Sequence, residues 1–167
     1  MKKRVTALLL LLLVVFMSGC KSITTGKAAA NVCDTQCQQE KDGYANVMNS
    51  FLVQIKEVTV KADDWKSVTK EDLEKVVSLR DKVVALNVPE DFKLVHDYYT
   101  RAFNHYVEAV TKIVSANNEY SSGSDVSNVA AHNIAMTIVV NNVQEANKIL
   151  IYADEESKFA TRLMSSL

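Results

Sequence analysis

Residues that interrupt helices are scarce in this chain. Pro89 is the only proline, and Gly43 and Gly123 are the only glycines after residue 30. Because so few breakers leave room for few turns, the chain favours a small number of long helices over a sheet with many short connections. Its length of 167 residues suits one domain rather than several.

Apolar residues recur at steps of three and four over four segments, and this period predicts amphipathic helices. We expect these helices over residues 31–62, from a cap at Thr69 to about Leu86, from Pro89 to about residue 120, and from about Asp125 to Leu163. A connection over residues 63–68 carries the only tryptophan, Trp65, and a turn is expected over residues 121–124. Four helices with short connections predict an all-α fold, an antiparallel up-and-down four-helix bundle.

Three helix starts carry recognisable patterns. Thr69 precedes Asp72 by three residues, which is the spacing of a capping box, and Ser122 precedes Asp125 in the same way. Pro89 suits the first position of a helix, where a missing N–H group costs no hydrogen bond.

Each expected helix has an apolar stripe that should face the core. The third helix has the clearest stripe, and the run from Ile134 to Val140 in the fourth is apolar on nearly all sides, so we expect it to be buried on more than one side. The stripes comprise Leu73, Val76, Val77, Val83 and Val84 in the second helix, Phe92, Val95, Tyr99, Phe103, Tyr106, Val110, Ile113 and Asn117 in the third, and Ala131, Ile134, Ala135, Ile138, Val139, Asn142, Val143, Ala146, Ile149, Leu150, Ala153 and Ala160 in the fourth.

The first twenty residues have the composition of a secretory signal peptide. Lys2, Lys3 and Arg4 precede a run from Val5 to Met17 in which Thr6 is the only polar residue. A basic start, a short apolar run and small residues at its end are typical of a leader that is removed after export. The run is too short for a comfortable membrane span, which needs about 20 apolar residues.

The end of this leader, Met17-Ser18-Gly19-Cys20, resembles the lipobox of bacterial lipoproteins. The resemblance covers residues 1–20. It implies that residues 1–19 are removed and that Cys20 becomes the N-terminus, linked through its sulfur to a diacylglycerol. Two or more acyl chains hold a protein stably on a bilayer. Lys21 is not the aspartate that marks inner-membrane retention, so the outer membrane is expected if the organism is diderm. The remaining alternative is an uncleaved anchor with Cys20 as a free thiol.

Residues 20–30 are small and polar after the cysteine, and we interpret them as a flexible tether to a helical domain over residues 31–167. Residues 86–110 are loosely similar to uncharacterised small helical lipoproteins, which implies no activity.

Removing residues 1–19 takes away three of the 19 basic residues and none of the 20 acidic ones, so the remaining net charge is −4. A nucleic-acid partner is therefore not expected, because such a partner needs a basic face.

Cys33 and Cys37 are the two thiols that remain if Cys20 carries lipid. An even number of thiols in an oxidising compartment favours a disulfide between them. Residues four apart in a regular helix have β-carbons about 5–6 Å apart, which is too far for a disulfide, so this bridge requires a distorted or later helix start. Pairing with a second chain and a free thiol pair are the alternatives.

No catalytic motif, cofactor or metal site is expected from the sequence. It contains no P-loop, no Gly-x-Ser-x-Gly elbow and no His-Glu-x-x-His. His96 and His105 are nine residues apart and do not form a ligand pair, and His132 lies on another helix, so we interpret His96 as a partly buried histidine with a hydrogen-bond partner. The adjacent acids Asp63-Asp64 and Glu155-Glu156 are expected to be solvated surface.

We therefore expect a lipid-anchored, non-enzymatic helical bundle that presents a helical surface to an unidentified protein partner, as an adaptor, inhibitor or assembly factor. The alternative is a bundle that binds a small ligand or a metal ion. A cavity lined by His96 and tyrosines would favour the ligand, whereas a solid core with an exposed apolar strip would favour the partner.

Overall fold

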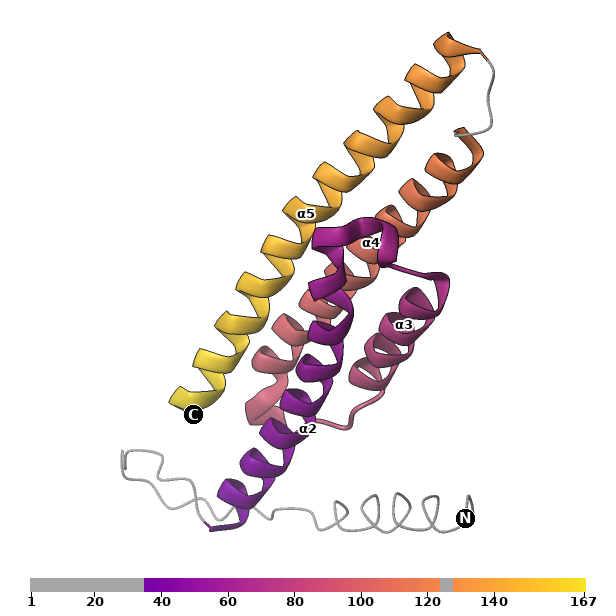
Figure 1. The fold of residues 1–167 in the computed structure, drawn as a ribbon. Coiled ribbons are helices and arrows are strands. Elements are labelled where there is room, and N and C mark those ends of the chain that lie inside the picture. Colours follow the sequence, from indigo (N-terminus) through magenta and orange to yellow (C-terminus); the bar gives the residue numbers. More distant parts are fainter. Residues whose placement is uncertain (1–34, 124–127) are drawn as a thin grey trace, which may run out of the picture. The chain divides into compact units, whose positions relative to one another are not determined.

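A computed structural model of the chain describes residues 35–123 and 128–167, which belong to one compact unit. Its elements are the α-helices α2 (Thr35–Thr59), α3 (Lys70–Val84), α4 (Lys93–Gly123) and α5 (Val129–Ser166), with short 3-10 helices η1 (Val60–Ser67) and η2 (Glu90–Phe92) between them. Successive α-helices run in opposite directions (Figure 1). The prediction of an all-α, antiparallel up-and-down bundle is confirmed. Within the described residues, no helix has the length and apolarity that crossing a bilayer requires.

The connection after α2 is held in place by α4. The expected first helix changes at Val60 to the 3-10 helix η1, in which Asp64 has a non-helical backbone. The Asn117 side chain of α4 donates hydrogen bonds to the backbone carbonyls of Trp65, at 3.0 Å, and Val68, at 2.7 Å. Because unpaired carbonyl groups are costly to bury, this amide stabilises an irregular segment against the bundle.

The capping box predicted at the start of α3 is confirmed. The Asp72 amide donates to the Thr69 hydroxyl, and the Thr69 amide donates to the Asp72 carboxylate. Lys61 of η1 lies 2.7 Å from the same carboxylate. Burial acts to raise the pKa of Asp72, but the Lys61 ammonium and the Thr69 donors outweigh it and hold this pKa below its ordinary value. The start of α3 is thereby tied to η1.

The stripe predicted for α3 is partly wrong. Val84 is exposed, and Leu79, which was not in the predicted stripe, is fully buried instead. The helix also ends at Val84, before the expected Leu86.

The boundary between α4 and α5 differs from the sequence prediction. The turn expected at residues 121–124 is wrong for Ser121 and Ser122, because α4 continues to Gly123. Their hydroxyls donate to carbonyls one turn back in α4, and His132 Nδ1 lies 3.0 Å from the Gly123 carbonyl oxygen, which gives the helix end a partner. Asn128, and not Ser122, caps α5 by accepting from the Ala130 amide.

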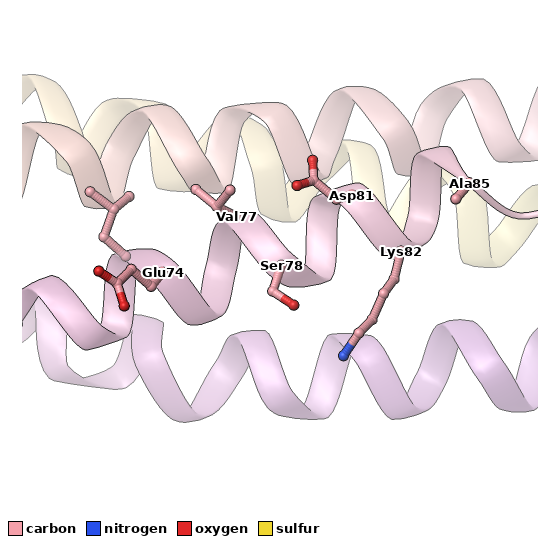
Figure 2. A pocket seen from close by; sticks show the side chains of 7 residues that line it. Glu74, Val77, Ser78, Asp81, Lys82 and Ala85 are labelled. Carbon is pink, nitrogen blue, oxygen red and sulfur yellow. The ribbon is translucent and has the colours of Figure 1, made fainter. Parts of the chain in front are cut away.

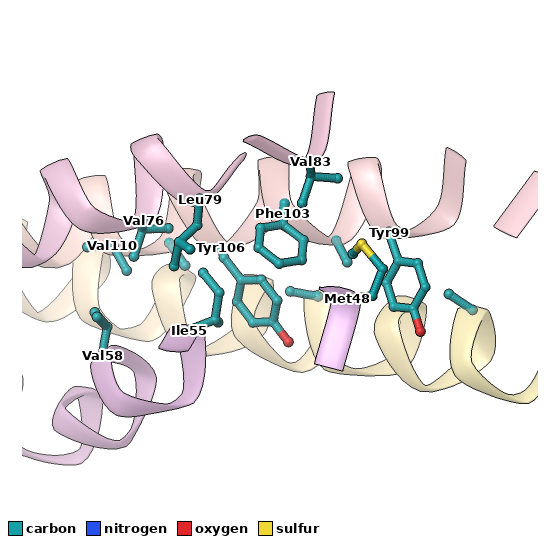
Figure 3. Close-up of a cluster of buried hydrophobic side chains, with 14 of the residues drawn as sticks. Met48, Ile55, Val58, Val76, Leu79, Val83, Tyr99, Phe103, Tyr106 and Val110 are labelled. Carbon is teal, nitrogen blue, oxygen red and sulfur yellow. The ribbon is translucent and has the colours of Figure 1, made fainter. Parts of the chain in front are cut away.

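The core is built mainly from side chains of α2, α3 and α4 (Figure 3). The stripe predicted for the third helix is confirmed, with Asn117 half-buried at its end. The largest fully buried side chains from these three helices are Met48, Ile55, Val58, Val76, Leu79, Val83, Val95, Phe103, Val110 and Ile113. The bulky core residues therefore lie between α4 and the two helices that precede it.

The contact between α4 and α5 is built from small residues instead. Ala102, Ala109, Ala116 and Gly123 are seven residues apart in α4 and all are buried. Residues seven apart in packed helices lie on one seam. Gly123 places this seam against α5, because a β-carbon on Gly123 would be 2.8 Å from the β-carbon of Ala135. The two backbones approach closely along it.

Small residues on α5 complete this seam. Ala146, Ala153 and Ala160 repeat every seven residues and are fully buried. Two tyrosines of α4 reach across to α5: Tyr99 bonds to the Thr161 hydroxyl at 2.9 Å, and Tyr106 donates to the Asp154 carboxylate at 2.6 Å. Burial, with the Asp154 carboxylate next in effect, raises the pKa of Tyr106, so this phenol keeps the proton that it donates.

The expectation for the apolar run in α5 is wrong. Ile134, Ile138 and Val140 are all exposed. Beside this run α4 continues alone, because α2 and the 15-residue α3 do not reach this end of the long helices (Figure 1). A run that is apolar on all sides can be buried only if other helices surround it, and here only α4 is adjacent.

The seam predicts a specific sensitivity to side-chain volume. Ala153→Leu should lower the free energy of unfolding by about 1–3 kcal/mol, because the larger side chain has no space between two close backbones. Ala130→Leu at an exposed position of α5 is the matched control and should change it little, since leucine is nearly as good a helix former as alanine. Urea unfolding measures the free energy of unfolding of both variants. Equal losses of this free energy in the two variants would show that the seam is not closely packed.

Candidate functional site

A hollow of about 320 Å³ lies on one face of the α4–α5 pair. It is lined by Tyr98 and His105 of α4 and by Tyr152, Glu155, Glu156, Phe159 and Arg162 of α5. Tyr98 and His105 are seven residues apart, as are Tyr152 and Phe159, so each pair lies along one edge of the seam. We call this site the aromatic hollow.

Aromatic rings form much of the aromatic hollow. The ring centroids of Tyr98 and Phe159 are 4.5 Å apart at 52°. The Arg101 guanidinium lies 4.2 Å from the centre of the Tyr98 ring, within the range of a cation–π contact. Tyr152 is 65% exposed and Phe159 42% exposed. Large aromatic side chains are thus presented to the surface from a closely packed pair of helices.

Glu156 orders the polar side of the hollow. Its Oε2 atom is 2.9 Å from His105 Nδ1, and its Oε1 atom is 3.5 Å from Arg101 Nε. The expectation that Glu155-Glu156 is solvated surface holds for exposed Glu155, which pairs with Lys158, and is wrong for half-buried Glu156. Among the described residues, Arg162 has no hydrogen-bond or ion-pair partner. It adds a guanidinium at the rim of the hollow.

The three histidines lie at separate places. His96 is half-buried, with its Nδ1 atom 3.0 Å from the Tyr44 hydroxyl, so the interpretation of His96 as a hydrogen-bonded structural residue is confirmed. His105 lines the aromatic hollow, and His132 binds the end of α4. In the part of the chain that the structure describes, no three His, Cys, Asp or Glu side chains are arranged to hold a metal ion.

Trp65 has a structural position. Its ring is half-buried and meets Tyr120 edge-on, with centroids 5.6 Å apart, and the Lys66 ammonium lies 4.1 Å from the centre of the Tyr120 ring. Trp65 packs against the core cluster. These contacts attach η1 to α4.

The structure does not test the predictions made for the cysteines. Cys37 belongs to the first turn of α2, whereas Cys20 and Cys33 lie outside the described residues. Lipidation of Cys20 and a Cys33–Cys37 disulfide therefore stay predictions.

A second hollow lies along α3 and is a weaker candidate. Its lining residues belong to α3 or directly follow it: Leu73, Glu74, Val77, Ser78, Asp81 and Lys82 of α3, and the C-cap residue Ala85 (Figure 2). Because one helix and its C-cap residue supply the whole lining, few polar groups can converge on a ligand from different directions, as binding sites usually require.

Tyr152 and Phe159 were not singled out from the sequence, although a signal for them exists. Each directly precedes a seam alanine, Ala153 and Ala160. Once the seven-residue repeat of alanines is recognised, the preceding positions must lie at the edge of the seam. The pairing with Tyr98 and His105 could not be found in this way, because it depends on how α4 and α5 align.

Comparison with known proteins adds no family or relative. No family model, curated protein or solved structure matches this chain.

His96 predicts a pH dependence of stability. Burial lowers its pKa below the ordinary value, and the Asp97 carboxylate offsets only part of that effect. The unfolded chain then binds a proton more readily than the folded one, so the His96 contribution to stability falls as pH decreases below the unfolded pKa of about 6.5.

We expect His96→Gln to reduce the loss of stability between pH 7.5 and pH 5.5 relative to the native chain. Urea unfolding at the two pH values measures the difference. An unchanged pH dependence in the variant would contradict the assignment.

Proposed function

We propose that this chain is a lipid-anchored, extracytoplasmic binding protein that recognises a protein partner through the aromatic hollow. The observation that carries the proposal is the exposure of Tyr152 and Phe159 beside Tyr98, on two helices whose spacing is set by the seam. Tyrosine and arginine are enriched among the residues that dominate protein–protein binding energies, and rigid aromatic anchors lose little entropy on binding.

The form of the hollow supports a protein partner over a small ligand. Small-molecule sites usually enclose most of the ligand surface. The aromatic hollow lies on an exposed helical face, and Tyr152 and Phe159 stand seven residues apart along α5, which suits a partner helix or loop. The proposal is of an adaptor, inhibitor or assembly factor rather than an enzyme, because the sequence contains none of the catalytic motifs named above.

The lipid anchor is supported by the lipobox-like sequence at Met17–Cys20. A lipid on Cys20 would place the folded residues close to a membrane and raise the local concentration of any partner held on the same surface. The partner is therefore expected among envelope proteins.

The anchor is tested by Cys20→Ala. This change should block incorporation of a fatty-acid analogue and release the protein from membranes or leave the leader uncleaved, because the thiol is the attachment atom. Metabolic labelling followed by membrane fractionation measures this. Labelling that persists in the variant would refute the anchor and leave the binding face untouched.

The binding face is tested by Tyr152→Ala and Phe159→Ala in the membrane-attached protein. If these residues are dominant contacts, each should weaken partner binding by about 2 kcal/mol or more, roughly 30-fold. Quantitative capture after mild crosslinking identifies the partners, and titration with the purified partner measures affinity.

Ile151→Ala is the matched control, because Ile151 is 63% exposed and adjacent to Tyr152 but points to a different side of α5. The native chain and this variant should capture the same proteins. Equal losses in all three variants, or no loss in any, would refute the role of the hollow.

A further inference from the structure

The aromatic hollow contains two carboxylates, and both already have basic partners. Glu155 pairs with Lys158 at 3.2 Å. Glu156 lies 2.9 Å from His105 Nδ1 and 3.5 Å from Arg101 Nε. Since both negative charges are balanced within the protein, they give a basic partner little electrostatic attraction.

One cation of the hollow has no such partner. Arg162 lines the hollow and is exposed, and no hydrogen bond or ion pair within the described part of the chain engages its guanidinium. Arg101, by contrast, packs over the Tyr98 ring at 4.2 Å and faces Glu156. Because each carboxylate of the hollow is balanced by a base, the uncompensated charge is that of Arg162.

Neighbouring charges do not reverse this balance. Lys148 and Glu108 each stand one helical turn outside the lining, and their opposite charges offset each other. The nearby Asp97 carboxylate acts on the pKa values of Tyr44 and His96 instead. The hollow therefore has a single positive charge to offer a partner.

This charge stands beside the aromatic anchors. Arg162 follows Phe159 by three residues, so the two side chains share one face of α5. We propose that the partner segment bound in the aromatic hollow carries Asp or Glu, whose carboxylate binds the Arg162 guanidinium while an adjacent apolar residue packs on Tyr152 and Phe159. This inference rests on the proposed function and adds the chemistry of the partner.

The geometry of the two groups gives this contact its selectivity. A guanidinium can bind a carboxylate through two parallel N–H···O hydrogen bonds, which fix the orientation of the ligand as well as its charge. A phosphorylated segment fits less well, because sites for phosphate groups usually gather several arginines. Here the one uncompensated guanidinium, Arg162, matches the single charge of a carboxylate.

A peptide selection tests the proposal with defined probes. A library of short random peptides displayed on phage is selected on the full chain in mild detergent, and peptides that also bind the Tyr152→Ala variant are removed. The peptides that remain bind through the hollow. They should be enriched in Asp or Glu next to a large apolar residue. Enrichment in Lys and Arg, or no excess of either charge, would overturn the proposal.

Charge reversal at Arg162 shows whether this residue sets the preference. Selection on Arg162→Glu should yield peptides enriched in Lys or Arg, whereas Arg162→Lys should keep the preference for acidic peptides because it keeps the charge. Lys82→Glu is the matched control, since it makes the same change in net charge at an exposed position of α3 and should leave the preference unchanged. A residue with a structural role alone would not exchange one preference for the other.

The affinity of the best acidic peptide measures the contact itself. Arg162→Gln should raise the Kd about fivefold, the effect of an exposed ion pair, and Lys82→Gln should not. Changing the acid of the peptide to its amide should have the same effect on the native chain and little further effect on Arg162→Gln, because the two changes remove one contact. A peptide with phosphoserine in place of the acid that binds more tightly would overturn the assignment of a carboxylate.

The outcomes separate this inference from the proposed function. If Tyr152→Ala and Phe159→Ala weaken peptide binding and the Arg162 variants do not, the hollow binds its partner without this carboxylate and only the inference fails. If the selection yields no peptide whose binding depends on Tyr152, the inference and the proposed binding face fail together.

Discussion

The close approach of α4 and α5 is the constraint on which the rest of this structure depends. Alanine or glycine at every seventh position of α4 meets a similar repeat in α5, and the β-carbon that Gly123 lacks would be 2.8 Å from Ala135. Dispersion contacts are strongest when atoms fill all the space between two surfaces. The seam thus provides a stiff two-helix unit, against which α2, η1 and α3 place their larger side chains.

Polar contacts complement this packing where the chain departs from regular helix. Asn117 supplies donors to η1, the capping box of Thr69 and Asp72 begins α3, and His132 meets the end of α4. Among the described residues, every buried side-chain nitrogen and oxygen has a hydrogen-bond partner. Since an unpaired buried polar group costs about 1–3 kcal/mol, losing one of these partners would destabilise the connection that it holds.

Much of the fold could be predicted from the sequence, because a period of three to four residues and the scarcity of breakers both act locally. The stripe from Phe92 to Ile113 and the capping box at Thr69 were recognised for that reason. The exposed run around Ile134 and the pairing of Glu156 with His105 were not, since they depend on how far α3 extends and on the alignment of α4 with α5. Those are properties of the tertiary structure and leave no local pattern.

The seven-residue repeat in α5 also links the interior of the protein to its surface. Ile138, Glu145, Tyr152 and Phe159 each stand one position before a buried residue, Val139, Ala146, Ala153 or Ala160. Substitutions in this outer row can change what the protein recognises without touching the interior. A single-residue insertion in the middle of α5 would instead rotate the following part of the row by about 100° relative to the part before it. Recognition by this face can therefore diversify by point substitution, whereas the length of α5 is under strict constraint.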